Sequence, residues 1–180
     1  MKTKLKSLTL PIAAAATLMF ATQGATAQDE AAMLEAFKEF IAPGPQHKQL
    51  KSLVGEWETL QKLWMAPGAP VVENKGTAKF RMIMGGRYLV QHYSSAIEGL
   101  GKFNGRGTTA YDKVAGEYVQ TWLDSFNTGI MVSKGKATDD GKSIELVGEA
   151  LDPATKTKVK FRTLSKYIDD NNYEMEMYEQ

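Results

Sequence analysis

The sequence predicts an all-β fold: a single antiparallel up-and-down barrel of about nine or ten strands behind a short N-terminal helical segment. The first observation is that apolar and polar residues alternate over nine short segments, which places alternate side chains on opposite faces of a strand. The second is that turn signals recur roughly every eight to twelve residues. The third is that the connections suit antiparallel neighbours and leave no room for parallel crossovers. A barrel would bury the apolar faces and remove the sheet edges, and a two-sheet sandwich is the alternative.

Residues 1–27 have the order of a secretory signal peptide. Three early lysines precede an apolar run from Leu8 to Phe20, and Ala25-Thr26-Ala27 forms a small-x-small cleavage site. The run is too short for a permanent membrane span, and an N-terminal anchor is the alternative. The sequence therefore predicts a periplasmic or secreted protein whose mature chain begins at Gln28. Cysteine is absent, so disulfides and thiol catalysis are excluded.

The charge of the mature chain bears on its partners. Loss of Lys2, Lys4 and Lys6 with the signal peptide changes the formal net charge from +1 to −2, and no basic block remains in the sequence. A mildly acidic surface of mixed charges predicts that neither nucleic acid nor anionic lipid is a partner.

Residues 28–53 predict a helical lead-in to the barrel. From Gln28 to Ile41 the apolar residues recur at three-to-four spacing on one face, and Pro43-Gly44-Pro45 ends the helix. A second short helix follows over 46–53, with Leu50 and Leu53 facing inward. A lid over one barrel end is the expected role of both helices, and a mobile N-terminal arm is the alternative.

Residues 54–180 predict one barrel domain, with no repeat and no second domain. The first strand begins at Gly55-x-Trp57, where glycine allows a sharp turn and the tryptophan lies across the barrel floor. Gly85-Gly86 predicts a two-residue hairpin turn. The strands are expected at about 55–65, 71–83, 87–96, 105–112, 117–125, 130–137, 143–150, 157–168 and 173–179.

The aromatic and methionine content suggests a ligand cavity inside the barrel. Polar residues occur on the same strand faces, where a fully packed core would normally avoid them. A cavity tolerates a few such groups among apolar ones, so we expect a small hydrophobic or amphipathic ligand. The expected walls are Trp64, Tyr93, Tyr111, Trp122 and Met131, and the expected polar anchors are Arg87, Gln120 and Asp124. The alternative is that these faces point to solvent.

Few residues suggest catalysis. The two histidines are His47, which is expected to be solvated, and His92, which has no second histidine or cysteine at a ligand spacing. The sequence therefore predicts neither a metal nor a cofactor. Asp124 shares a strand face with Trp122 and could be an acid or base of raised pKa, although a turn-capping role is favoured.

Several motifs follow one another in the order of a known family. They are Leu53-Val54-Gly55-Glu56-Trp57, Trp64-Met65-Ala66-Pro67-Gly68-Ala69-Pro70, Gly85-Gly86-Arg87-Tyr88-Leu89, Gly105-x-Gly107-Thr108-Thr109-Ala110-Tyr111-Asp112, Thr121-Trp122-Leu123-Asp124-Ser125 and Thr128-Gly129-Ile130-Met131. Together they resemble a bacterial, mostly secreted family of uncharacterised proteins with a lipocalin-like (calycin-type) barrel. The resemblance covers roughly residues 47–180 and implies a fold, without a substrate or a catalytic residue.

The resemblance also implies a further strand after the Glu-Met-Tyr segment, whereas this chain stops at Gln180. Without that strand, the first and ninth strands would be sheet edges that need a partner, a bulge or a lid. The expectation is a destabilised monomer or a homodimer that closes the barrel.

Three hypotheses for the function follow. The first is a binding protein for a small, partly apolar molecule. The second is a barrel enzyme that uses Asp124 or His92 as an interior acid or base. The third is a cell-envelope interaction protein that uses an open barrel edge and binds no ligand.

Overall fold

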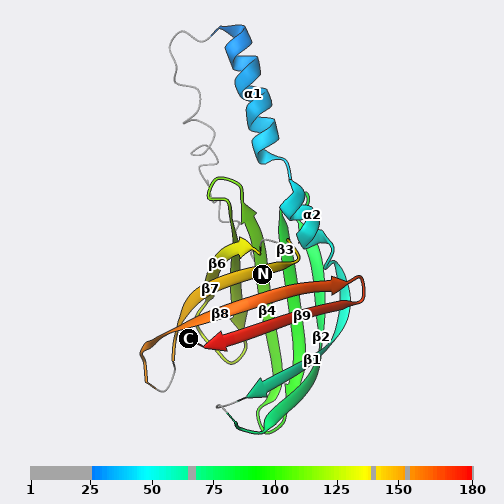
Figure 1. The fold of residues 1–180 in the computed structure, drawn as a ribbon, viewed down its shortest axis with the longest axis vertical. Coiled ribbons are helices and arrows are strands. Elements are labelled where there is room, and N and C mark those ends of the chain that lie inside the picture. Colours follow the sequence, from blue (N-terminus) through cyan, green and yellow to red (C-terminus); the bar gives the residue numbers. More distant parts are fainter. Residues whose placement is uncertain (1–25, 65–67, 139–140, 153–154, 180) are drawn as a thin grey trace, which may run out of the picture. The chain divides into compact units, whose positions relative to one another are not determined.

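The computed structural model describes residues 26–64, 68–138, 141–152 and 155–179 (Figure 1). The predicted signal peptide, 1–27, therefore lies almost wholly outside the described residues. The contacts divide the chain into two units, one ending at Ala42 and the other beginning at Pro43. No helix among the described residues is long and apolar enough to cross a membrane.

The first unit contains helix α1 (Ala27–Ile41), which confirms the helix predicted for this segment. Thr26 caps its N-terminus because its hydroxyl accepts a hydrogen bond from the Asp29 amide while the Asp29 carboxylate accepts from the Thr26 amide. This reciprocal capping box satisfies two amides that otherwise lack a partner in the first turn.

The second unit contains helix α2 (Pro45–Lys51), which confirms the second short helix and has Pro45 in its first turn. Nine antiparallel strands follow and pair in sequence order, so each strand neighbours the next one along the chain. They are β1 (Gly55–Trp64), β2 (Val71–Ile83), β3 (Tyr88–Ile97), β4 (Gly101–Asp112), β5 (Glu117–Asp124), β6 (Met131–Ala137), β7 (Ser143–Leu151), β8 (Lys158–Asp169) and β9 (Asn172–Glu179).

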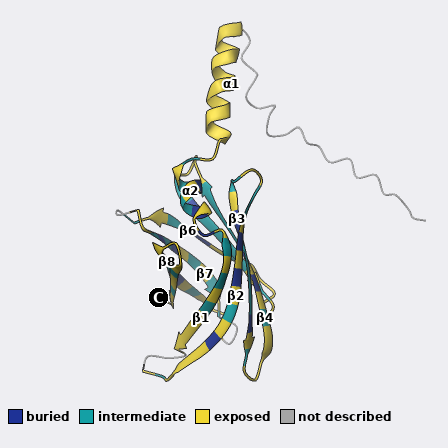
Figure 2. Cartoon of the chain, turned by 90° about the vertical axis from the view of Figure 1, so that its right-hand side faces the viewer, coloured by how far each residue is buried: buried dark blue, intermediate teal, exposed yellow. Residues whose placement is uncertain are grey.

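The sheet curls into a half-barrel, as Figures 1 and 2 show, with β1 and β9 as its two edges. No ladder joins β1 to β9 within the described residues. The two edges nevertheless approach each other at one level, where the ring of Trp57 on β1 lies 6.5 Å from that of Tyr173 on β9. The all-β meander is thus confirmed, in a form that leaves part of its interior open.

The register assigns each side chain to one of two faces. We call the face that carries the buried core the inner face and the opposite one the outer face. We call the end at which α2 lies the capped end, and the end with the β1–β2, β3–β4 and β5–β6 turns the distal end. The core at the capped end comprises Leu50, Leu53, Ala78, Phe80, Leu89, Tyr118, Ile144 and Leu146.

Most strand boundaries agree with the sequence prediction within one residue, and two features differ by more. The β2–β3 turn has four residues, Met84–Arg87, rather than two, and positive φ extends over Met84, Gly85 and Gly86. Strand β4 begins at Gly101 rather than 105, because Lys102 and Phe103 pair with Ala96 and Ser95 of β3. The glycines at 99 and 101 indicate a turn, but only the register with β3 shows where the turn ends.

Candidate functional site

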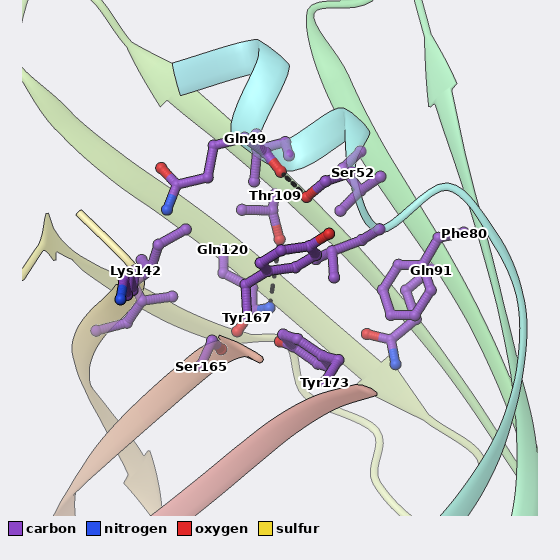
Figure 3. A pocket seen from close by; sticks show the side chains of 15 residues that line it. Gln49, Ser52, Phe80, Gln91, Thr109, Gln120, Lys142, Ser165, Tyr167 and Tyr173 are labelled. Carbon is purple, nitrogen blue, oxygen red and sulfur yellow. Dashed lines mark hydrogen bonds between the residues drawn. The ribbon is translucent and has the colours of Figure 1, made fainter. Parts of the chain in front are cut away.

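A small cavity lies beneath α2 on the inner face (Figure 3). It offers about 40 Å³ to the centres of water-sized molecules, which is room for a few waters. Its lining combines apolar and polar side chains: Gln49, Leu50, Ser52, Leu53, Phe80, Leu89, Gln91, Thr109, Gln120, Lys142, Ile144, Leu146, Ser165, Tyr167 and Tyr173. This mixture of apolar walls and a few polar groups is typical of small-molecule sites, although the volume is far smaller.

Helix α2 forms the roof of this cavity and is held by both packing and hydrogen bonds. Leu50, only 1% exposed, fills the capped end. Gln49 accepts a hydrogen bond from the Tyr118 hydroxyl at 2.6 Å and donates to the Gly141 carbonyl at 3.0 Å, so it joins α2 to β5 and to the β6–β7 turn. Burial, with the neighbouring Tyr111, raises the pKa of Tyr118 to about 12.

His47 is buried, at 6% exposure, and the expectation that it is solvated is wrong. Its Nδ1 accepts a hydrogen bond from the Gly44 amide at 3.0 Å, so the imidazole gives the N-cap residue of α2 a hydrogen-bond partner. Its ring also packs edge-on against Tyr111. Burial lowers the pKa of His47, and the positive charges of Lys113 and Arg87 lower it further. The neutral imidazole is therefore part of what holds α2 in place.

Polar side chains cross the inner face at the floor of the cavity. Gln120 donates to the Thr109 hydroxyl at 3.3 Å, and the two residues pair across β4 and β5 (Figure 3). Within the described residues, the side chain of Gln91 forms no hydrogen bond, so its amide is available to another group. Burial raises the pKa of Tyr173, and a hydrogen bond with Ser165 opposes that rise.

An aromatic cluster occupies the inner face on the distal side of this polar row. The ring of Tyr93 lies 5.9 Å from Phe103 and 6.5 Å from Trp122. The indole of Trp122 lies against the backbone of β4 at Gly105, where an added Cβ would come within 2.1 Å of the ring. Glycine at 105 is therefore required for this tryptophan to lie flat on the sheet.

Asp124 takes the turn-capping role that the sequence favours. Its Oδ1 accepts from the Phe126 amide at 2.9 Å, and Asn127 also donates to the carboxylate. Its Oδ2 accepts from the indole nitrogen of Trp122 at 3.0 Å. Both oxygens are thus used in fixing the turn and the tryptophan.

Three hydroxyl groups on the inner face are buried without a hydrogen-bond partner among the described residues: those of Thr59, Tyr93 and Ser95. They surround Gly76, which pairs with Thr59 on one side and Ser95 on the other, and an added Cβ at Gly76 would meet the Tyr93 hydroxyl at 2.9 Å. A buried hydroxyl without a partner destabilises the fold, so this level of the barrel is not optimised for stability.

The distal part of the inner face is open to solvent along β9. Met175 and Met177 pair with Ser165 and Thr163, which places both methionines on the inner face. Even so, Met175 is 52% exposed and Met177 is 54% exposed. On the same strand, Tyr173 reaches Trp57 and Phe80 and is covered. The inner face therefore changes from closed to open within two residues of β9.

The register brings six of the eight sequence-predicted site residues to the inner face of β3–β6. They are Tyr93, Tyr111, Gln120, Trp122, Asp124 and Met131. Trp64 is not among them, because it lies on the outer face at the end of β1 and is 58% exposed. Arg87 lies in the β2–β3 turn, where its guanidinium donates to the Met84 carbonyl at 3.0 Å. Whether any of the eight binds a ligand stays a prediction.

His92 lies on the outer face, because it pairs with Lys79 and Arg106 rather than with inner-face residues. It therefore cannot be an acid or base inside the barrel. The residues described as lining the cavity beneath α2 include no carboxylate and no imidazole. No cluster of histidines and carboxylates suited to a metal occurs among the described residues. The arrangement is suited to holding a molecule by packing and hydrogen bonds.

Sequence reasoning did not single out Gln49, Tyr118 or Tyr173 as site residues. The period of two predicts that Tyr118 shares the face of Gln120 and that Tyr173 points inward with Met175. The register confirms both, but neither tyrosine was chosen as a binding residue. Gln49 carried no signal, because its contacts with Tyr118 and Gly141 join segments that lie far apart in the sequence.

The geometry can be compared with known proteins. The fold and site define a small antiparallel half-barrel with an interior that is partly open. Residues 42–180 match a family model described as "Protein of unknown function (DUF1579)", and the chain belongs to this family. The match coincides with the unit of α2 and the nine strands, beginning one residue before it. No curated protein matches the chain.

Proposed function

We propose that this protein binds a small, partly apolar molecule on the inner face of its half-barrel. The observation that carries the proposal is the exposure of Met175 and Met177 on a face that is buried at the capped end. Apolar side chains that face inward but contact water offer area that a ligand would remove from solvent. Methionine suits this role because its flexible thioether side chain adapts to ligands of different shape.

Polar and aromatic neighbours supply the rest of the proposed site. The free amide of Gln91 and the amide of Gln120 are the polar groups that would orient the ligand. Trp122 and Met131, which pair across β5 and β6, would form one wall. The ring of Tyr93 would contribute to this wall, while its hydroxyl is closed to solvent. Trp64 and Arg87 are left out because they lie away from this surface.

The size of the closed cavity sets the position of the ligand. Small-molecule sites commonly have about 300–1,000 Å³, whereas the space beneath α2 is about 40 Å³. The apolar body of the ligand would therefore occupy the open distal part of the inner face, with its polar end directed toward Gln91. Export to the periplasm or beyond is part of the proposal and rests on the signal-peptide sequence alone.

Binding can be tested with 1-aminoanthracene, a small, neutral and mostly apolar fluorescent probe. The purified protein is titrated with the probe, and the affinity is compared with that of the double variant Met175→Gln/Met177→Gln. Both methionines are half exposed, so the variant should fold normally while losing contact area for the ligand. We expect affinity to fall about tenfold. Ile168→Gln, at an exposed position of β8 where the register with β9 shifts, is the control and should not change the affinity.

Equal affinity in the methionine double variant, or an equal loss in Ile168→Gln, would contradict the proposal. Native mass spectrometry of the protein purified from its own host adds a second test, since a mass excess that disappears on denaturation identifies a bound molecule. A bare dimer would instead favour interaction through the unpaired edges of β1 and β9, which is the second candidate function.

A further inference from the structure

A second hollow lies on the outer face of β2–β5, apart from the proposed ligand surface. It has a volume of about 590 Å³, within the range of small-molecule sites. Residues from four neighbouring strands line it, and the register explains why. Lys79, His92, Arg106 and Leu123 form one cross-strand row, and Thr77, Ser94 and Asn104 form the next.

The first row is cationic. Arg106 and the nearby Arg81 form no ion pair within the described part of the chain, whereas Lys79 pairs with Glu56. On β8 and β7, by contrast, Arg162 pairs with Glu145 at 2.7 Å. Arg81 on β2 and Arg106 on β4 are therefore the positive charges of this region that have no carboxylate partner among the described residues.

The pKa of His92 is affected by several of these cations together. Burial is the largest cause that lowers the pKa of its imidazole, and the charges of Arg106, Arg81 and Lys79 lower it further. Three cations close enough to act on one ring are close enough to act on one bound anion.

The second row supplies uncharged hydrogen-bond donors. Ser94 donates to the Oδ1 atom of Asn104 at 3.3 Å, which leaves the amide NH₂ group of Asn104 directed elsewhere. The Ser125 hydroxyl oxygen accepts a hydrogen bond from the backbone amide of Asn104 at 3.0 Å. The hydroxyl hydrogen of Ser125 therefore remains available to donate. The one carboxylate at the border of the hollow, Asp124, is engaged by Trp122 and by its own turn.

We infer that this hollow binds a soluble organic phosphate, such as a phosphate monoester of a small polyol. The planar guanidinium of Arg106 matches a phosphate group in two hydrogen bonds. Lys79, which also pairs with Glu56, lies in the same row and offers a further N–H donor. Asn104, Ser125 and Thr77 are placed to bond the remaining oxygen atoms and the polyol hydroxyls. The hollow is larger than a bare phosphate requires, which favours a phosphate carried on an organic group.

A lipid phosphate is the less suitable source of the same chemistry. Peripheral membrane binding needs apolar side chains that enter the interface beside the basic ones. Leu123 is the single large aliphatic side chain among the described residues that line the hollow.

The test uses the chain's two histidines as reporters. The full-length protein, purified without a histidine tag, is titrated with inorganic phosphate and then with glycerol 3-phosphate, and the imidazole signals are followed by NMR. Sodium chloride at matched ionic strength and glycerol are the control titrations. We expect the His92 signals to shift saturably with both phosphates, while those of His47, buried under α2, stay in place. Phosphate should also raise the pKa of His92, because an anion offsets the surrounding cations.

Variants decide whether the effect belongs to the hollow. Arg106→Gln, at an exposed position, should weaken phosphate binding about tenfold. Arg106→Lys, which keeps the charge but lacks the planar fork, should weaken it less. Lys160→Gln, which removes an exposed outer-face charge on β8, is the matched control and should leave it unchanged. Far-UV circular dichroism checks that each variant is folded.

Three outcomes would overturn the inference. The first is that sodium chloride shifts the His92 signals as much as phosphate does, and the second is that Arg106→Gln and Lys160→Gln lose the same amount of phosphate affinity. The third is that the protein binds phosphatidylglycerol vesicles but not glycerol 3-phosphate. This inference can be tested separately from the proposed interior ligand, since Arg106, Lys79 and Asn104 lie on the outer face and the two sites have separate variants.

Discussion

The capped and distal ends of the inner face share the same nine strands. They differ in how many of their polar side chains have hydrogen-bond partners and in how much of their apolar surface is buried. At the capped end the Tyr118 hydroxyl donates to Gln49, and the Trp57 indole donates to the Leu53 carbonyl at 2.9 Å. Toward the distal end the hydroxyls of Thr59, Tyr93 and Ser95 have none within the described residues, and Met175 and Met177 contact water. The difference indicates that the capped end contributes more to stability, whereas the distal end leaves apolar area in contact with water.

The largest expected effect is the loss of the capped-end core. Leu50→Ala removes a side chain that is 1% exposed and fills the space beneath α2, so the free energy of unfolding should fall by about 2–5 kcal/mol. Met177→Ala, on the same face at the distal end, should cost less than about 1 kcal/mol because its side chain is already half exposed. Urea denaturation of the two variants measures both values. Similar losses would remove the distinction between the ends.

The next effect tests how closely the Trp122 ring packs on the backbone of β4 at Gly105. In Gly105→Ala the new methyl group would come within 2.1 Å of the Trp122 ring, so the ring or the strand must move. We expect a loss of about 1–3 kcal/mol together with a change in tryptophan fluorescence. Gly129→Ala is the control, because no atom lies within 4 Å of its added Cβ and its φ is not positive. An unchanged stability in Gly105→Ala would mean that Trp122 is loosely held.

A smaller effect, which depends on pH, should come from His47 at the capped end. Its pKa is lowered on folding, so below its ordinary value of 6.5 the unfolded chain binds the proton first. Stability should therefore decrease as the pH falls from 6.5 through the folded-state pKa. His47→Gln keeps an acceptor for the Gly44 amide but cannot titrate, and should flatten this dependence.

His92 also has a lowered pKa, so His92→Gln is the matched control for the pH experiment. It should remove only its own part of the pH dependence and leave that of His47. Urea denaturation at several pH values between 5 and 8 measures both. A His47→Gln variant with the full wild-type dependence would show that α2 is not held by the neutral imidazole.

The features that were predicted from the sequence are those set by local periodicity. Tyr118, Gln120, Trp122 and Asp124 share a face because a strand alternates strictly, and the register with β4 confirms it. The period was less clear in β1, where apolar residues occur on both faces, and Trp64 was therefore assigned to the interior although it lies outside.

What could not be predicted depends on contacts between distant segments. The burial of His47 follows from the docking of α2 on the strands, which no local pattern encodes. The outer-face cations show the same limit, because Lys79 and Arg106 are 27 positions apart in the sequence and the register of β3 brings them into one row. The sequence contains no basic block, yet the folded sheet has a basic hollow.

The smallest expected effect tests the distal hydroxyls directly. Thr59→Val replaces a buried hydroxyl that has no partner among the described residues with a methyl group of similar shape. If the hydroxyl is unpartnered in solution, its removal should be neutral or should stabilise the protein by up to about 1 kcal/mol. Tyr118→Phe, at the capped end, removes a hydroxyl that donates to Gln49 and should cost about 1 kcal/mol. Thermal unfolding should therefore show a lower Tm for Tyr118→Phe and an unchanged or higher Tm for Thr59→Val. A destabilised Thr59→Val would contradict the comparison, because it would show that the Thr59 hydroxyl is bonded to a water or a ligand and that polar groups at both ends have partners.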